Sequence, residues 1–186
     1  MKFEIEEISG CYFLAHENHR DLRGMSTEIF NISDNLRDFN VAQVFISRSM
    51  KNVIRGLHYS KYPHLQDMIV TCLSGSVRDV LVDIRIDSPT FSSIYKFELD
   101  EDLRRSVFIP SGVAHGYEVM KNKTLMHYLL SRSYDPSNEF TINPIKSGLE
   151  IYWETTEPIL SKKDANSLNF EDAARNNLLP IYLENS

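Results

Sequence analysis

One ten-residue run, SVRDVLVDIR at positions 76–85, constrains the fold most, because its apolar residues recur at every second position. A period of two is typical of a β-strand, whose successive side chains point to opposite faces of a sheet. One face carries Val80, Val82 and Ile84, and the other mixes charges with a leucine (Asp79, Leu81, Asp83 and Arg85). The mixed face either meets solvent or lines the inside of a barrel, and the pattern leaves both readings open.

Short alternating runs continue along most of the chain and predict a mostly β fold, a sandwich or small barrel. They are separated by turn residues, and Ser74-Gly75-Ser76 predicts a tight hairpin between the runs at 67–73 and 76–85. Further turns are expected at Ser88-Pro89, Pro110-Ser111-Gly112 and Lys121-Asn122. The segment 166–179 instead has helical spacing with acids near its start, so we expect a short C-terminal helix.

Composition excludes several classes of function. The 186 residues fit a single domain spanning 1–186. A net charge of −6 without a basic cluster argues against a nucleic-acid partner. Since no apolar run approaches the roughly 20 residues that cross a bilayer, and the start lacks a signal-peptide pattern, we expect no membrane association and a cytoplasmic location. Cys11 and Cys72 form no spaced motif and read as two buried thiols in a reducing compartment.

Four stretches carry side chains capable of chemistry: NVIRGLHYS, IPSGVAHGYEV, LSKKDA and LMHYLL. They contain His58, His115, Asp164 and Tyr128, respectively. Taken singly, each has an ordinary structural interpretation. His58 would be a half-buried strand histidine, and Asp164 would be a surface acid in a polar loop.

A metal-binding cupin is one interpretation of two histidines and a Pro-x-Gly-x-x-His turn. Metal cupins usually present a His-x-His pair on the earlier strand with a glutamate nearby. Here His58 is followed by Ser60, so the pair is missing, and His64 falls in a predicted loop. Two histidines alone are too few ligands, and we expect no metal.

Six motifs in order resemble the dTDP-4-dehydrorhamnose 3,5-epimerase family: DLRGMSTEIF, NVIRGLHY, VRDVLVDIRIDSPTF, IPSGVAHGY, YLLSRSYDPSNE and LSKKD. The resemblance runs from about Asp21 to Asp164. It implies a cupin-type β-sandwich or jelly-roll barrel, a homodimer, no metal or organic cofactor, and a nucleotide-diphosphate 4-keto sugar as substrate.

The resemblance also implies catalytic roles. His58 matches the base that removes a proton next to the C4 ketone, and Asp164 matches the carboxylate paired with it. Tyr128 matches the acid that reprotonates the sugar from the other face, and His115 matches a second histidine of the lumen. These roles are chemically reasonable, because an unperturbed histidine titrates near pH 6.5 and a phenol is protonated at neutral pH.

Binding roles follow from the same motifs. Arg55 matches the arginine that meets the diphosphate, a task that suits a guanidinium. Gln43 and Tyr134 match positions near the base and the sugar. Arg23 and Glu28 match positions that reach the nucleotide from the neighbouring subunit, although an ordinary surface ion pair is the alternative.

The chain departs from the family at three places. Met68 replaces a lysine held to stabilise the enolate oxygen, Phe45 replaces an asparagine, and 143–146 read NPIK where a tryptophan and Asp-Pro are usual. A thioether cannot stabilise an oxyanion electrostatically. Four groups are candidates to compensate: Lys61, His64, Arg85 and His115.

The leading interpretation is an epimerase acting at C3, C5 or both of a nucleotide-linked 4-keto-6-deoxy sugar, in cell-surface polysaccharide synthesis. The departures leave dTDP or GDP open as the nucleotide, and a 4-keto-heptose open as the sugar. Two alternatives are a 3,4-ketoisomerase on the same scaffold and a catalytically silent sugar-binding cupin.

Overall fold

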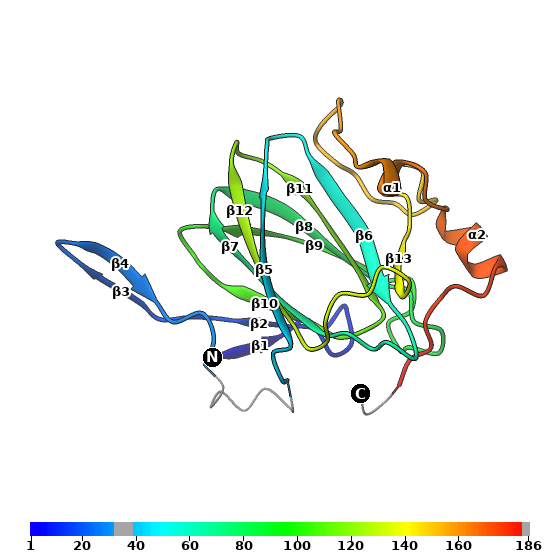
Figure 1. Cartoon of the computed structure of the whole chain (residues 1–186), viewed down its shortest axis with the longest axis horizontal. Coiled ribbons are helices and arrows are strands. Elements are labelled where there is room, and N and C mark those ends of the chain that lie inside the picture. Colours follow the sequence, from blue (N-terminus) through cyan, green and yellow to red (C-terminus); the bar gives the residue numbers. More distant parts are fainter. Residues whose placement is uncertain (32–38, 184–186) are drawn as a thin grey trace.

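Two antiparallel sheets face each other in the computed structural model, which describes residues 1–31 and 39–183 (Figure 1). The larger sheet has the order β1 (Lys2–Glu4), β2 (Tyr12–Leu14), β10 (Ser106–Ile109), β7 (Met68–Ser74), β12 (Thr124–Leu130), β5 (Gln43–Ser49). The smaller sheet has the order β13 (Glu139–Thr141), β6 (Ile54–Ser60), β11 (Val113–Val119), β8 (Ser76–Asp83), β9 (Ile94–Asp100).

Three smaller elements complete the described fold. β3 (Asn18–Asp21) and β4 (Gly24–Thr27) pair as an arm that projects from the body (Figure 1). The short helices α1 (Lys162–Ala165) and α2 (Phe170–Arg175) follow the last strand. The Asn169 side chain caps α2 by accepting a hydrogen bond from the Asp172 backbone N–H, which explains why the helix starts there.

The predicted mostly β, cupin-type sandwich with a short C-terminal helix is confirmed. From β10 to β12, each successive strand enters the sheet opposite to the one before it. This crossing is the jelly-roll pattern, which places residues far apart in the sequence on facing walls. The Pro110-Ser111-Gly112 turn makes one of these crossings, and Gly112 adopts a positive φ of 86° there.

The predicted hairpin at Ser74-Gly75-Ser76 is wrong. β7 pairs with β10 and β12, whereas β8 pairs with β9 and β11, so the turn carries the chain from one sheet to the other. Gly75 has a φ of +84°, and a Cβ there would lie 2.2 Å from the Thr124 Oγ1 atom. The local pattern marks the turn, but packing against a distant strand decides that it is a corner between sheets.

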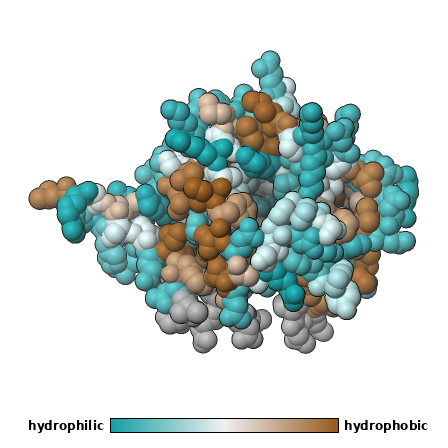
Figure 2. Space-filling view, viewed as in Figure 1, coloured by the Kyte–Doolittle hydropathy of each residue, from teal (hydrophilic) through white to brown (hydrophobic). Residues whose placement is uncertain are grey.

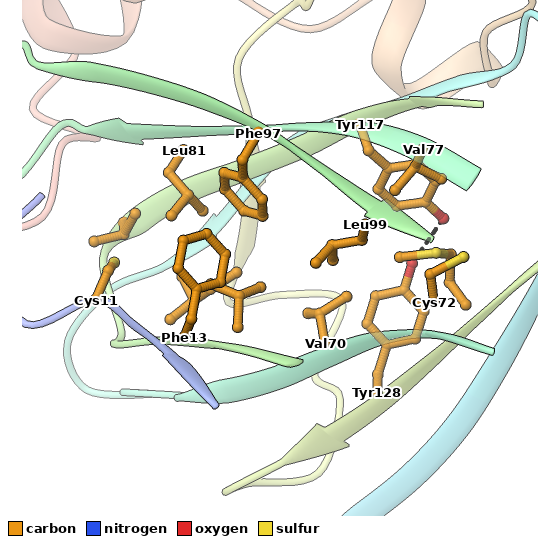
Figure 3. Close-up of a cluster of buried hydrophobic side chains, with 14 of the residues drawn as sticks. Cys11, Phe13, Val70, Cys72, Val77, Leu81, Phe97, Leu99, Tyr117 and Tyr128 are labelled. Atoms are coloured by element: carbon orange, nitrogen blue, oxygen red, sulfur yellow. Dashed lines mark hydrogen bonds between the residues drawn. The ribbon is translucent and has the colours of Figure 1, made fainter. Parts of the chain in front are cut away.

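Both faces of β8 are buried. Asp79, Leu81 and Asp83 are fully buried, so the mixed face lines the inside of the barrel and the solvent-facing alternative is wrong. Leu81 joins the core between the two sheets, shown in Figure 3. The opposite face, Val80 and Val82 among it, packs beneath the segment that follows β13.

The two cysteines are free and buried, as expected. Burial raises the pKa of the Cys72 thiol to about 12 and raises that of Cys11 as well. Both are therefore protonated and unreactive at neutral pH. Among the described residues, no helix is long and apolar enough to cross a membrane.

A buried ion pair closes one end of the barrel. The Arg85 guanidinium donates to Asp83 through Nε at 2.8 Å and Nη2 at 2.7 Å, and Nη2 also donates to the Ser9 carbonyl. The Thr90 hydroxyl donates to the same carboxylate. Burial alone would raise the pKa of Asp83, but the hydrogen bonds and the charge of Arg85 outweigh it and hold that pKa below its ordinary value.

Asp83→Asn should destabilise the fold by about 3 kcal/mol or more, because it leaves the Arg85 charge buried without its counter-ion. Urea unfolding of the variant and the parent protein measures this loss. Glu98→Gln is the matched control, since Glu98 meets Arg78 at the surface at 3.5 Å, and there a change of about 0–1 kcal/mol is expected.

The pKa of Asp83 also predicts how its contribution to stability changes with pH. Because the folded pKa of Asp83 is lowered, its stabilisation is present above the unfolded value of about 3.9 and is lost as the pH falls through the lower folded value. The difference between parent and Asp83→Asn should therefore shrink below about pH 4. A constant difference down to pH 2 would contradict the assignment.

Candidate active site

Two glycines bring β6 and β11 unusually close together. Gly56 has a φ of +109°, and a Cβ there would lie 2.5 Å from the His115 carbonyl oxygen. A Cβ on Gly116 would lie 2.8 Å from the Arg55 carbonyl oxygen. In this pairing His58 and His115 are directly opposite each other, so their side chains share one face of the sheet.

A pocket of about 480 Å³ opens on that face, between the two sheets. Its walls come from β5, β6, β11, β12, the start of β13, α1 with its N-cap Ser161, and Tyr134 in the loop before β13. Fourteen residues line it: Gln43, Phe45, Ser47, Arg55, His58, His115, Gly116, Tyr117, Tyr128, Tyr134, Glu139, Ser161, Lys163 and Asp164.

His58 and Asp164 form a histidine–carboxylate pair. The His58 Nε2 atom lies 2.8 Å from Asp164 Oδ1, and the two side chains are 31% and 4% exposed. Burial would raise the pKa of Asp164, but its hydrogen bond with His58 and the His58 charge outweigh this and lower it. The carboxylate is therefore ionised at neutral pH, and it fixes the orientation of an imidazole that remains open to the pocket.

Asp164 does not lie in a polar surface loop, the position that the sequence pattern taken alone suggests. It belongs to α1, whose N-cap Ser161 accepts a hydrogen bond from the Asp164 backbone N–H. This short helix turns the acid inward toward β6, and the nearby Gly56 backbone N–H adds to the lowering of its pKa.

His115 has a carboxylate of its own. Its Nε2 atom lies 2.9 Å from Asp79 Oδ2, and both side chains are buried. Burial raises the pKa of Asp79, and the hydrogen bond and charge of His115 reverse this only in part. In the described part of the chain, Asp79 Oδ1 has no hydrogen-bond partner.

Tyr128 comes from β12, in the sheet opposite the one that carries His58. Its ring stacks on Phe45, with the ring centroids 4.3 Å apart and the planes 4° from parallel. Its hydroxyl donates to the Tyr117 hydroxyl at 2.7 Å (Figure 3). Burial raises the pKa of Tyr128 well above its ordinary value, so the phenol is protonated at neutral pH.

Three predicted binding residues also line the pocket. Arg55 donates from Nε to the Ser49 hydroxyl at 3.0 Å, on the β5 side. Gln43 accepts from the Tyr134 backbone N–H at 2.6 Å, so these two residues meet across the mouth. The geometry therefore gathers seven of the nine predicted site residues around one cavity: Gln43, Arg55, His58, His115, Tyr128, Tyr134 and Asp164.

The remaining two, Arg23 and Glu28, are not among the residues that line this pocket. Arg23 lies on the β3–β4 arm, where its side chain is 91% exposed and donates from Nε to Asp21 at 3.0 Å. Glu28 follows the arm and accepts from the Asn31 side-chain amide. Neither position contributes to the cavity of its own chain.

The position that carries a lysine in the family is outside the pocket in this structure. Met68 packs against the core and does not line the pocket. Of the four candidate replacements for the lysine, His115 lies in the pocket. The other three bond elsewhere: Lys61 to the Asn177 carbonyl, His64 to the Ser133 carbonyl and Arg85 to Asp83.

Sequence reasoning missed several residues of the pocket. Ser47 and Tyr117 meet the Tyr128 hydroxyl, and Lys163 forms an ion pair with Glu139 at the rim. Tyr117 follows the AHG motif directly, and its position two residues beyond His115 on the same strand was a usable signal. Nothing in the local sequence marks Ser47.

Within the residues that the structure describes, no group of three or more histidine, cysteine, aspartate and glutamate side chains is placed to hold a metal ion. The pocket instead combines an imidazole–carboxylate pair on one wall with a protonated phenol on the other. Such a pair of groups can remove a proton from one face of a bound ring and return one to the other.

Gly56→Ala should destabilise the protein by about 3 kcal/mol or more, because the methyl group would clash with β11 at a backbone φ that alanine also disfavours. Gly148→Ala is the control, since Gly148 has a φ of +76° and a methyl group added there would meet nothing within 4 Å. It should lose only about 1–2 kcal/mol. Equal losses in urea unfolding would mean that the close approach of the strands is not what requires glycine.

Comparison with known proteins agrees with this geometry. The family model described as dTDP-4-dehydrorhamnose 3,5-epimerase matches residues 6–172. The dTDP-4-dehydrorhamnose 3,5-epimerase of Mycobacterium tuberculosis is 36% identical over 190 residues, which covers 98% of this chain and 94% of that protein.

Solved structures of similar proteins have the same fold. NovW, a 4-keto-6-deoxy sugar epimerase from the novobiocin biosynthetic gene cluster of Streptomyces spheroides, superposes with a TM-score of 0.93 at 32% identity, covering 98% of this chain and 93% of NovW. ChmJ, a 3′-monoepimerase from Streptomyces bikiniensis in complex with dTDP-quinovose, gives a TM-score of 0.88 at 34% identity, covering 93% and 90%. Since the similarity extends over nearly the whole chain, this protein belongs to the dTDP-4-dehydrorhamnose 3,5-epimerase family.

Proposed function

We propose that this protein epimerises a dTDP-linked 4-keto-6-deoxy sugar, with His58 as the base and Tyr128 as the acid. One observation carries the proposal: these two groups line a single pocket but come from opposite sheets. Inversion at a carbon requires a proton to leave one face of the sugar and another to arrive at the opposite face.

The base step uses the histidine–carboxylate pair. A proton next to a ketone is acidic enough for an imidazole to remove, provided that the enolate formed is stabilised. Asp164 accepts the hydrogen bond from one ring nitrogen and stabilises the imidazolium that results. The other ring nitrogen is the one available to the sugar.

Enolate stabilisation falls to a group other than the family lysine, since Met68 stands at that position, packs against the core and does not line the pocket. His115 is the nearest candidate along the sheet, because it stands directly opposite His58 and lines the same pocket. The Asp79 carboxylate fixes the His115 ring through Nε2, and Nδ1 is a donor to the enolate oxygen when both ring nitrogens carry a proton.

The positions of the other pocket residues suggest which part of the substrate each one binds. Arg55 supplies a cation suited to a diphosphate, and Gln43 and Tyr134 stand at the mouth, where the nucleotide and sugar would enter. Among the similar proteins, ChmJ is described in complex with a dTDP-sugar, which favours dTDP over GDP. The family resemblance further implies cytoplasmic deoxysugar synthesis, with cell-surface polysaccharide as its destination.

The number of inverted carbons is a property to be measured. Relatives of similar identity include a 3,5-epimerase and a 3′-monoepimerase. Solvent deuterium counts the carbons that exchange, and NMR of the product assigns their configuration. The same spectra identify a 3,4-ketoisomerase by the position of the ketone, and a silent binding protein incorporates no label.

With dTDP-4-keto-6-deoxyglucose in D₂O, the parent protein should incorporate deuterium next to the ketone and invert the labelled carbon. His58→Asn should lower both rates by about 10²–10⁴-fold, because general-base catalysis is lost. Tyr128→Phe should retain exchange through His58 but lose inversion. Mass spectrometry and NMR of one reaction measure both rates.

Two outcomes would contradict this assignment of roles. A folded His58→Asn protein with normal exchange would remove His58 from the base step. A Tyr128→Phe protein with full inversion would remove Tyr128 from the acid step. His64→Asn is the matched histidine control, since His64 does not line the pocket and bonds to a backbone carbonyl.

We further propose a homodimer in which the β3–β4 arm completes the nucleotide site of its partner. The arm projects from the body and presents Leu22 and Arg23 fully to its surroundings (Figure 1). β5 is the edge strand of its sheet and exposes Val44, Phe45 and Ile46. Figure 2 shows hydrophobic side chains gathered over this part of the molecule, which suits a contact with a second copy.

Mixing Arg23→Ala and His58→Asn subunits should restore part of the activity that each homodimer lacks, because one site of the hybrid would contain both native groups. The recovered activity should approach about a quarter of the parent value under random exchange. The control is a mixture of His58→Asn and Tyr128→Phe subunits: both changes lie in the pocket of one subunit, so neither site of the hybrid would be intact and inversion should not recover. Absence of recovery while subunits demonstrably exchange would count against a shared site.

A further inference from the structure

Three hydroxyl groups meet at the Tyr128 side of the pocket. The Tyr128 and Tyr117 hydroxyls are 2.7 Å apart, and the Ser47 hydroxyl lies 3.0 Å from Tyr117 and 3.4 Å from Tyr128. They come from β12, β11 and β5, so the cluster joins both sheets (Figure 3 shows the two tyrosines). The mechanism outlined above uses only one of the three.

Burial makes this neighbourhood unfavourable for a phenolate. Tyr117 and Tyr128 are 2% and 7% exposed. Desolvation opposes the charge that Tyr128 acquires when it gives its proton to the sugar. The step therefore needs a hydrogen-bond donor directed at the Tyr128 oxygen at the moment when the charge forms.

Tyr117 is placed to become that donor. In the structure Tyr128 donates to Tyr117, so its O–H points away from a bound sugar. To act as the acid, Tyr128 must turn its O–H toward the sugar carbon, and its oxygen then needs a donor. A hydroxyl can reverse roles in this way because it both donates and accepts, whereas the phenylalanine ring in its place could do neither.

Ser47 and Arg55 extend the cluster toward the solvent. Ser47 is half-buried, and its hydroxyl can replace the proton that Tyr117 passes on. Arg55 donates to Ser49, two residues along the same face of β5. Burial raises the pKa of Tyr117, and its hydrogen bonds with Ser47 and Tyr128 and the charge of Arg55 oppose this in part.

We infer, on the basis of the proposed function, that Tyr117 is a positioning residue of the acid step: it switches from acceptor to donor as Tyr128 protonates the sugar, and with Ser47 it returns a solvent proton to Tyr128. The protons balance. The Tyr128 O–H breaks as the sugar C–H forms, Tyr117 protonates Tyr128, Ser47 protonates Tyr117, and water protonates Ser47. The proton that His58 removed leaves to solvent.

Tyr117→Phe tests the inference. Deuterium exchange through His58 should stay near the parent rate, while inversion should fall about tenfold to 100-fold, because a hydrogen bond to a charged group is lost. A purely structural role would lower both rates together. Tyr59→Phe is the matched control: Tyr59 is equally buried, but its hydroxyl bonds to the Leu178 carbonyl outside the pocket, so the ratio of exchange to inversion should not change.

Ser47→Ala serves as a second, smaller change if Tyr117→Phe folds poorly. It should lower inversion less than Tyr117→Phe and again leave exchange near the parent rate. An unchanged ratio of exchange to inversion in both variants would overturn the inference. Loss of both rates in parallel would do so too.

A measurement without substrate separates this inference from the proposed function. With 3-fluorotyrosine at position 128, the ¹⁹F shift follows ionisation of that phenol as the pH is raised. In the structure Tyr117 accepts from Tyr128 and thereby raises the pKa of Tyr128, so loss of an acceptor alone would move the midpoint downward in Tyr117→Phe. If Tyr117 instead becomes a donor to the phenolate, its loss should move the midpoint upward, and a downward movement would overturn the inference. Asp79 also acts on Tyr128, and it is the same in both proteins. So are the charged and titratable groups that line the pocket: Arg55, His58, His115, Glu139, Lys163 and Asp164. An unmoved midpoint would overturn the inference, whereas a parent protein inactive on the sugar would overturn only the proposed function.

Discussion

The close crossing of β6 and β11 is the constraint on which the rest of the site depends. Gly56 and Gly116 face each other there without side chains, and the two backbones approach to a distance that any Cβ would obstruct. That approach sets His58 beside His115 and directs both rings into the space between the sheets. On the same strand as Gly56, the His58 Nε2 atom meets the Asp164 carboxylate at 2.8 Å.

Environment separates the two groups proposed to move protons. His58 keeps about a third of its side chain exposed and has a buried, ionised carboxylate at its back. Tyr128 lies almost entirely within the core, between the Phe45 ring and the Tyr117 hydroxyl. The site therefore places His58 as a proton acceptor and Tyr128 as a proton donor. Tyr128 keeps its proton until a hydrogen-bond donor stabilises the phenolate. Such pairing of unlike environments is how a single fold carries out acid and base steps at one pH.

Of the three departures from the family pattern, Phe45 lines the pocket, on its acid side, whereas Met68 and the segment 143–146 do not line it. Phe45, where an asparagine is usual, forms the stacked cover of Tyr128. Met68, where a lysine is usual, packs against the core and does not line the pocket. The base side, with His58 and Asp164, retains the family residues. Changes in specificity within this chain are therefore expected in how the sugar is held and reprotonated, while proton removal is preserved.

The sequence by itself determined the strands, the turns and the identity of the histidine–carboxylate pair. Strand periodicity and turn residues are local, so the mostly β class and the positions of the turns were readable. The ordered motifs identified Asp164 despite its 106-residue distance from His58. Tertiary structure alone decided that the Gly75 turn joins two sheets and that Asp79 faces inward. It alone also brought Ser47 to Tyr117, 70 positions away. The physical reason is that a two-residue periodicity identifies the residues that share a face of a strand. It does not identify the strand or sheet against which that face will pack.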